Sequence, residues 1–294
     1  MHVIIFIWGF TGILGKLILL SPEKIVWFRI LIAVLGLLVI LKFRKTPLKL
    51  ANSRDIWKLI IVGFFVSMHW LTFYKSISLS TASLGILCLS TTTIHVTWLE
   101  PFIMKRKFSW LEFILGLIIM YGIYFVSGNF NAQQYEALAY GLTSAFFAAL
   151  FSVFNAKLVQ TIPSAQISFY ELLVGLVVLT VFLFTSGNVN AELFVMRWED
   201  FAWLLFLGVV CTSFAFVAIV DVVKELGAFT VSLSINLEPV YTILLAIVLL
   251  HEHEMLSEKF YIGASIIILI VVANGLLKYA LKRRTNRPII KRFH

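Results

Sequence analysis

Ionisable side chains occur inside stretches of this sequence that are otherwise apolar. Glu238 precedes Pro239 near the middle of one stretch, and His95 lies within another. Polar groups inside a membrane are costly, so each is a candidate for function. Glu238 could bind a substrate amine or carry a proton, or it could be a neutral or paired residue that supports packing. His95 could change its charge near neutral pH, and the alternative is a hydrogen-bonded packing residue.

Helical spacing groups the candidate side chains into stripes, because residues three or four positions apart lie on one face of a helix. The stripes contain Trp8 and Thr11, Trp70 and Tyr74, Thr91 and His95, and finally Ser234, Glu238 and Tyr241. If these faces converge, they line a polar and aromatic cavity.

Arg29 and Glu171 are two further charged candidates, and each lies early in an apolar stretch. The two stretches occupy equivalent places in the two halves of the chain, so the two residues could form part of a gate. The alternative for Arg29 is that its long side chain reaches the lipid headgroups.

The elements that must position these residues are ten apolar stretches of near-regular spacing. A helix needs roughly 20 apolar residues to cross a bilayer, and only helices and closed barrels satisfy their backbone groups there. Strand alternation is missing, so the sequence predicts an all-α membrane protein with ten transmembrane helices. The stretches are Val3–Leu20, Ile25–Leu41, Ile56–Ile77, Ala82–Met104, Phe108–Val126, Ala137–Val159, Ala165–Thr185, Phe201–Val223, Ala228–Leu250 and Phe260–Leu281.

The composition supports a membrane protein. Hydrophobic residues make up 61% of the chain and charged residues 13%, whereas soluble domains carry about 25% charged residues. Cys88 and Cys211 both fall inside apolar stretches. We expect them to be small packing residues rather than a disulfide.

The net charge of +9 comes from basic clusters that follow or join the predicted helices. The clusters lie at 42–58, at 105–107 and after Lys278. With ten helices all three fall on one side, which the positive-inside rule makes cytoplasmic. We therefore expect a multi-pass protein of the cytoplasmic (inner) membrane with both termini in the cytoplasm. A nucleic-acid partner is not expected, because the basic residues do not form a groove interleaved with aromatic residues.

The polar segment 129–136 divides the ten stretches into two sets of five. Asp55 precedes Gly63 by the same spacing as Asp200 precedes Gly208, which indicates two divergent copies. Because five is odd, a duplicated five-helix unit inserts in the opposite orientation. The sequence therefore predicts two inverted five-helix repeats around a central cavity, at residues 1–128 and 137–281, followed by a basic cytoplasmic tail at 282–294.

Motifs for other chemistry are weak in this chain. The segment His251–Glu254 contains metal-ligating residue types, but its spacing matches no closed site and it ends a helix. Walker, nucleophile-elbow and zincin motifs are missing from the sequence. We expect no cofactor, no metal and no enzymatic activity.

An ordered set of short motifs resembles the EamA family of the drug/metabolite transporter superfamily. The motifs are Trp8-Gly9-Phe10-Thr11 with Lys16, Phe28-Arg29, Asn155-Ala156-Lys157, and Asn236-Leu237-Glu238-Pro239-Val240. The first half departs from the pattern, since Thr93 stands where the second half has Pro239. The resemblance implies a ten-helix transporter with a central cavity that moves small metabolites such as amino acids or organic cations.

The leading hypothesis is therefore a secondary or facilitative transporter, and we expect it to export amino acids or amphipathic and cationic solutes by alternating access. The alternative is a channel or a lipid-handling membrane protein, which a continuous pore or a lateral groove would favour. Expected partners are a small-molecule substrate and the lipid bilayer, and the chain could form a homodimer.

Overall fold

The computed structural model describes residues 1–50, 52, 54–105, 107–186, 193–215, 218 and 237–285. Every regular element in these ranges is helical, and no strand occurs among them. The first half contains α1 (His2–Leu17), α2 (Pro22–Phe43), α3 (Asp55–Leu79), α4 (Ala82–Leu89), α5 (Thr92–Met104), α6 (Trp110–Val126) and the 3₁₀ turn η1 (Ser127–Asn129). The second contains α7 (Ala132–Leu158), α8 (Ser164–Thr185), α9 (Trp198–Leu205), the π-helical segment η3 (Phe206–Phe214), α12 (Glu238–Leu250), the 3₁₀ turn η4 (Glu252–Glu254) and α13 (Glu258–Thr285).

Several described segments have the length and composition of membrane spans. Five of them are long and apolar enough to cross a bilayer, namely Pro22–Phe43, Asp55–Leu79, Ala82–Met104, Ala132–Leu158 and Ser164–Thr185. Shorter apolar helices are His2–Leu17, Trp110–Val126 and Glu238–Leu250. The predicted all-helical membrane class is confirmed for the part of the chain that the structure describes.

Local sequence signals explain where these helices start. Pro22 opens α2 at a position that needs no backbone donor. Asn131 and Gln134 form a capping box at the start of α7. Ser109 and Thr81 accept hydrogen bonds from the first turns of α6 and α4. These caps satisfy backbone donors that would otherwise be left without partners.

One predicted span is broken. The stretch Ala82–Met104 is not one continuous helix, because α4 ends at Leu89 and α5 begins at Thr92. The Thr91 hydroxyl donates to the Cys88 carbonyl oxygen at 2.7 Å, and the Thr91 amide donates to the same oxygen. Ser and Thr side chains compete in this way for helical backbone groups, so a run of four hydroxyl residues interrupts the helix.

Glu238-Pro239, which the sequence places near the middle of an apolar stretch, lies at the start of a helix in the structure. The helix α12 begins at Glu238, and Pro239 lies in its first turn, where a missing N–H is tolerated. The part of the predicted stretch Ala228–Leu250 that precedes Leu237 lies outside the described residues.

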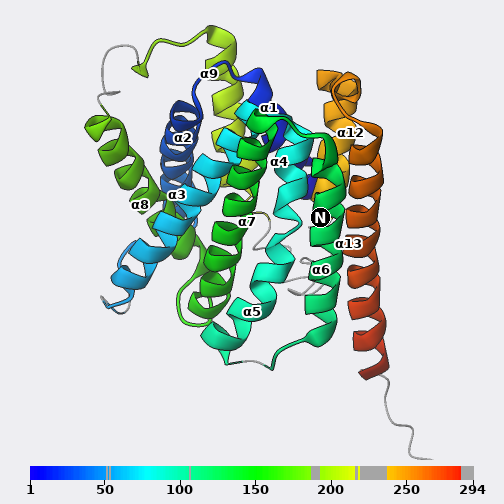
Figure 1. The fold of residues 1–294 in the computed structure, drawn as a ribbon. Coiled ribbons are helices and arrows are strands. Elements are labelled where there is room, and N and C mark those ends of the chain that lie inside the picture. The colour runs from blue at the N-terminus through cyan, green and yellow to red at the C-terminus, as the bar shows by residue number, and fades with distance from the viewer. Residues whose placement is uncertain are drawn as a thin grey trace, which may run out of the picture.

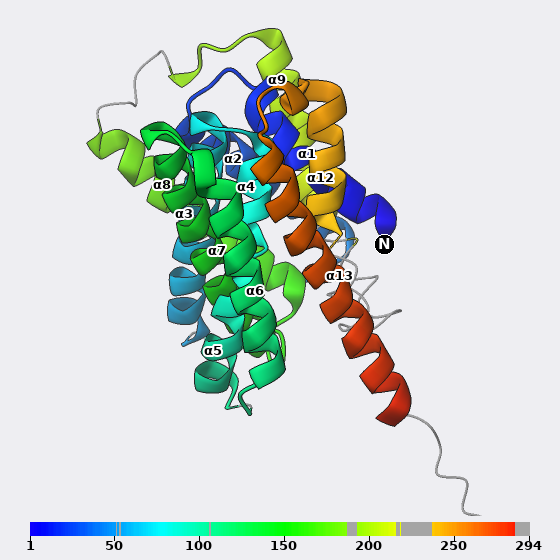
Figure 2. The same ribbon diagram turned by 45° about the vertical axis from the view of Figure 1, so that its right-hand side comes forward.

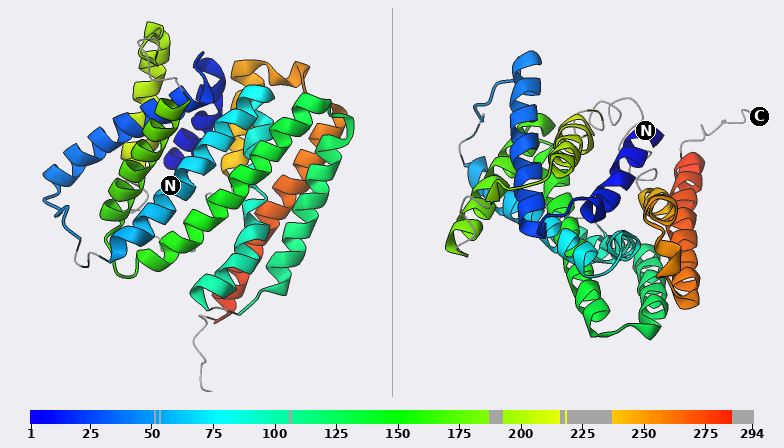
Figure 3. Two further views of the ribbon diagram at one scale, coloured as in Figure 1. Left: turned by 60° about the vertical axis from the view of Figure 1, so that its left-hand side comes forward. Right: turned by 90° about the horizontal axis from the view of Figure 1, so that it is seen from above.

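The helices pack into one bundle around α3, whose main neighbours are α7 and α8. At one edge, α6 and α13 lie side by side (Figures 1 and 2). Viewed from above, α1 lies next to α12 (Figure 3). The end of α5, the start of α6 and the last turns of α13 lie at the lower end of the bundle in Figure 1, and α3 starts toward the same end.

Candidate functional site

Arg29 is a buried cation near the first turns of α2. Only 4% of its surface is exposed. Its Nη1 donates to the Tyr74 hydroxyl at 3.0 Å, and its Nε donates to Thr212 Oγ1 at 3.0 Å. The guanidinium carbon also lies 4.0 Å from the centroid of the Trp70 ring, a cation–π geometry. Hydroxyl and aromatic groups, rather than the headgroups, thus surround this cation.

The π-helical segment η3 places the Thr212 hydroxyl at Arg29. The hydroxyl donates to the Leu207 carbonyl oxygen five residues earlier while it accepts from Arg29. Such π-helical turns are rare and occur frequently at functional sites. Gly208 allows η3 to approach α2 closely, because a Cβ at this position would clash with Ile32, lying 2.5 Å from its Cγ2.

Residues of α1 and α12 complete the surroundings of Arg29. The Tyr74 hydroxyl donates to the Thr11 carbonyl oxygen at 3.4 Å. Glu238, which is half-buried, interacts electrostatically with Arg29. We call Arg29, Trp70, Tyr74, Thr11 and Thr212 the Arg29 centre. It joins α1, α2, α3 and η3, and the Glu238 carboxyl of α12 lies close enough to interact with the Arg29 charge.

The structure brings three of the predicted stripe residues, Trp70, Tyr74 and Thr11, together with the gate candidate Arg29. The Thr11 hydroxyl donates to the Trp8 carbonyl oxygen. Thr212 was missed. A signal for it exists, because Ser67 follows Gly63 by the same four residues that separate Thr212 from Gly208.

Other predicted residues lie elsewhere. Thr91 is fully buried at the break between α4 and α5. His95 packs against Trp98 and Phe146, with ring centroids at 6.4 and 5.4 Å, and its Nδ1 has no hydrogen-bond partner in the described part of the chain. The Tyr241 hydroxyl contacts His2 Nδ1 at 3.0 Å. Ser234 lies outside the described residues.

Glu171 does not meet Arg29. It lies on α8 with 3% of its surface exposed, and Asn155 Nδ2 of α7 donates to its Oε2 at 3.2 Å. The two charges that the sequence paired as gate candidates therefore have separate partners. Arg29 contacts α3 and η3, while the Glu171 side chain contacts α7.

Hydrogen bonds to Glu252 join segments that are far apart in the sequence. The buried Glu252 carboxylate accepts from the backbone N–H groups of Ala82 and Ser83, at 2.7 and 3.0 Å. Carboxylates are favourable at helix N-termini, so Glu252 caps α4. Lys16 of α1 donates to the Ser80 carbonyl oxygen and interacts electrostatically with Glu252.

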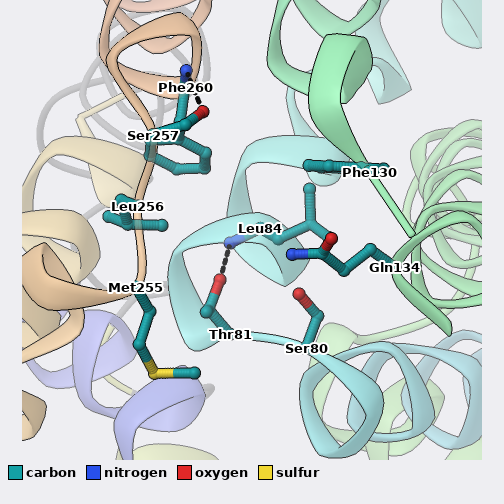
Figure 4. Close-up of a pocket in the computed structure, with 9 residues that line it drawn as sticks. All are labelled: Ser80, Thr81, Leu84, Phe130, Gln134, Met255, Leu256, Ser257 and Phe260. Carbon is teal, nitrogen blue, oxygen red and sulfur yellow. Dashed lines mark hydrogen bonds between the residues drawn. The ribbon is translucent and has the colours of Figure 1, made fainter.

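A pocket of about 130 Å³ opens beside this cap (Figure 4). Its lining consists of Ser80, Thr81, Leu84, Phe130, Gln134, Met255, Leu256, Ser257 and Phe260. Several of its polar groups serve as helix caps, since Thr81 accepts from the Leu84 amide and Ser257 from the Phe260 amide. This pocket lies apart from the Arg29 centre, and its polar groups maintain the helix starts.

Metal-ligating side chains do not gather in the described residues, where no group of three or more His, Cys, Asp or Glu could hold an ion. Within the segment His251–Glu254, Glu252 is used as the cap of α4, and the two histidines are exposed.

A bundle of apolar helices, several of them long enough to cross a bilayer, is typical of a multi-pass membrane protein. The model of the EamA-like transporter family matches residues 1–128 and 136–275, so the chain belongs to this family of membrane transporters. The chain is 26% identical over 247 residues to the "Uncharacterized transporter YdfC" of Bacillus subtilis, covering 81% of this chain and 77% of that protein. It is 22% identical over 198 residues to "Uncharacterized transporter YxxF" of the same organism, covering 66% and 62%.

The fold is similar to that of a solved crystal structure. The match has a TM-score of 0.67 and 14% sequence identity, and it covers 94% of this chain and 95% of the other. At this identity the similarity supports the fold alone.

Proposed function

We propose that this protein is a secondary or facilitative transporter that exports small organic metabolites by alternating access, with the substrate bound at the Arg29 centre. The observation that carries the proposal is the setting of Arg29. Among the described residues, its hydrogen-bond partners are the uncharged hydroxyls of Tyr74 and Thr212. These hydrogen bonds do not neutralise the guanidinium, so it could attract a substrate carboxylate, while the Glu238 carboxyl, which interacts with the Arg29 charge, could receive a substrate amine. Amino acids fit this pair best, followed by amphipathic or cationic solutes.

The contacts between the halves support an inverted repeat. A Cβ at Gly63 would lie 2.7 Å from the Glu171 carbonyl oxygen, and a Cβ at Gly208 would lie 3.3 Å from the Arg29 carbonyl oxygen. Gly63 and Gly208, which occupy equivalent places in the two halves, thus form equivalent close contacts. At Gly63, α3 packs against α8, and at Gly208, η3 packs against α2. The helices α3 and α9 also start at opposite ends of the bundle (Figure 1). Rocking of one half against the other would expose the Arg29 centre to each side in turn.

Helix starts at corresponding positions are a second support. After the break at Ser90 and Thr91, α5 begins at Thr92, and α12 begins at Glu238. Transporters commonly place discontinuous helices at their substrate sites, where helix ends offer unpaired backbone groups.

A thermal-shift screen on purified protein tests the substrate site, because a ligand that binds the folded state raises its stability by mass action. We expect amino acids to raise the unfolding temperature, and their methyl esters, which lack the carboxylate, to have a smaller effect. Arg29→Gln should abolish the shift. Lys42→Gln, which removes an exposed cation from the same helix, should keep it. A shift that survives Arg29→Gln would place the substrate elsewhere.

A further inference from the structure

Two buried oxygen atoms between α7 and α8 have no hydrogen-bond donor. They are Glu171 Oε1 and Asn155 Oδ1, and neither has a partner among the described residues. They belong to two side chains that already touch, because Asn155 Nδ2 donates to the other carboxyl oxygen, Glu171 Oε2, at 3.2 Å. Buried polar atoms are normally paired, so two orphan acceptors on one contacting pair need an explanation.

A single proton satisfies both atoms. A carboxylic acid and a primary amide form a cyclic pair in which the amide N–H donates to one carboxyl oxygen and the acid O–H donates to the amide oxygen. The first of these bonds is present. The second would join Oε1 to Oδ1 if the proton sat on Oε1, since an ionised carboxylate is an acceptor only.

The charges on the neighbouring helices have other partners. On α3, Lys58 pairs with Asp55 at 2.6 Å, and the buried His69 contacts Ser144 of α7. On α7, Lys157 donates to the Ile103 carbonyl oxygen. On α2, Arg29 donates to Tyr74 and Thr212. Among the described residues, the Glu171 carboxyl therefore has no charged partner that would keep it ionised in its apolar surroundings.

Apolar packing separates this pair from the lower end of the bundle. Leu59 at the start of α3, Leu158 at the end of α7 and Ile167 in the first turn of α8 belong to one buried cluster, which also contains Val62 and Ile162. Helix α8 approaches α3 closely at the same level, through Gly63 and the Glu171 carbonyl oxygen. If these contacts opened, water would reach the carboxyl from that end.

We propose that Glu171 and Asn155 form a proton-binding site, and that opening of the α3–α8 contact exchanges its proton with the solution. The site binds one H⁺ from water on the carboxylate and releases it to water, so no other reactant is needed. The link to transport rests on the proposed function, in which rocking of the halves would open this contact. In this proposal Glu171 has a proton-binding role, whereas the sequence suggested it as part of a gate.

Infrared spectroscopy of the reconstituted protein tests the site without a substrate, because a carboxylic acid and a carboxylate absorb at different frequencies. We expect a carboxylic C=O band near neutral pH that disappears in Glu171→Gln. It should stay in Glu136→Gln, which alters an exposed carboxylate of α7. In Asn155→Leu the band should move to higher frequency, because its C=O loses the amide donor. A band unchanged in Glu171→Gln would overturn the proposal. If that variant fails to fold, an unshifted band in Asn155→Leu would overturn it instead.

A second measurement tests the coupling separately. Proteoliposomes are loaded with the radiolabelled amino acid that gives the largest thermal shift, and efflux is measured with and without an imposed pH gradient. Efflux by the wild type and by Glu136→Gln should change with the gradient, whereas efflux by Glu171→Gln should not. A gradient response in Glu171→Gln would contradict the coupling. Absence of any efflux by the wild type would instead contradict the transport function, while the infrared result would still decide the proton site.

Discussion

The guanidinium of Arg29 lies over the indole ring of Trp70, with 4.0 Å between the guanidinium carbon and the ring centroid. Trp70 itself is 6% exposed, so the contact is largely desolvated. This aromatic face stabilises a buried positive charge without neutralising it, and the proposed function assigns that charge to the substrate carboxylate.

Replacing Trp70 tests this contact. A desolvated cation–π pair contributes up to about 2 kcal/mol. We expect Trp70→Leu to lower the unfolding temperature and to weaken the thermal shift that ligands produce. Trp70→Phe, which keeps an aromatic face, should retain part of both. Equal behaviour of the two variants would mean that Trp70 only fills space.

The Glu252 cap makes a prediction about stability. Glu252→Ala leaves the buried N–H groups of Ala82 and Ser83 without their acceptor, and an unsatisfied buried group costs about 1–3 kcal/mol. Glu254→Ala is the matched control, because this carboxylate lies in the same turn and is exposed. Thermal unfolding of both variants measures the difference. If Glu252→Ala is no less stable than Glu254→Ala, the cap does not contribute to stability.

The contact between α3 and α8 makes a packing prediction. A Cβ at Gly63 would lie 2.7 Å from both the Glu171 carbonyl oxygen and Val174 Cβ. Gly63→Ala should therefore destabilise the protein by about 1–3 kcal/mol, as overpacking does. At Gly128 the nearest atom is Cδ of the flexible Lys259 side chain, at 3.2 Å, so Gly128→Ala should be tolerated. Denaturation of the two variants in the same detergent would show whether this order holds.

The basic segments predict the orientation of the protein in the membrane. Arg44 follows α2 in a basic segment that we predict to be cytoplasmic, and Glu136 lies in the first turns of α7, which the same predicted topology places outside. A membrane-impermeant thiol reagent added to intact cells should label Glu136→Cys quickly and Arg44→Cys slowly. The native Cys88 and Cys211 are buried and should add little background. Rapid labelling of Arg44→Cys would reverse the assigned sidedness.

The sequence predicted the helical membrane class and several residues of the Arg29 centre, for a simple physical reason. Long apolar runs specify spans through the cost of burying backbone groups in lipid, and the rarity of buried polar groups marks Arg29, Tyr74 and Glu238 for attention. Stripes on single helices do not specify which helices face each other. His95 and Tyr241 share stripes with other candidates, yet they pack against Phe146 and His2.

The breaks in the helices were harder to predict. Hydrophobicity is continuous through Ser90 and Thr91, so the span signal does not fall there, although the hydroxyl side chains capture backbone groups. Likewise, the five-residue spacing of the bonds from Thr212 to Leu207 and from Ser213 to Gly208 belongs to a π-helical turn, for which hydrophobic periodicity gives no signal.

Trans-stimulated exchange in proteoliposomes tests the central claim most directly. Vesicles are filled with the unlabelled amino acid that gives the largest thermal shift, and uptake of the labelled compound is measured. Alternating access at the Arg29 centre predicts that internal substrate accelerates uptake by the wild type and by Lys42→Gln, and that Arg29→Gln takes up no more than empty vesicles. Uptake that does not respond to internal substrate, or that persists in Arg29→Gln, would contradict the account and favour a channel.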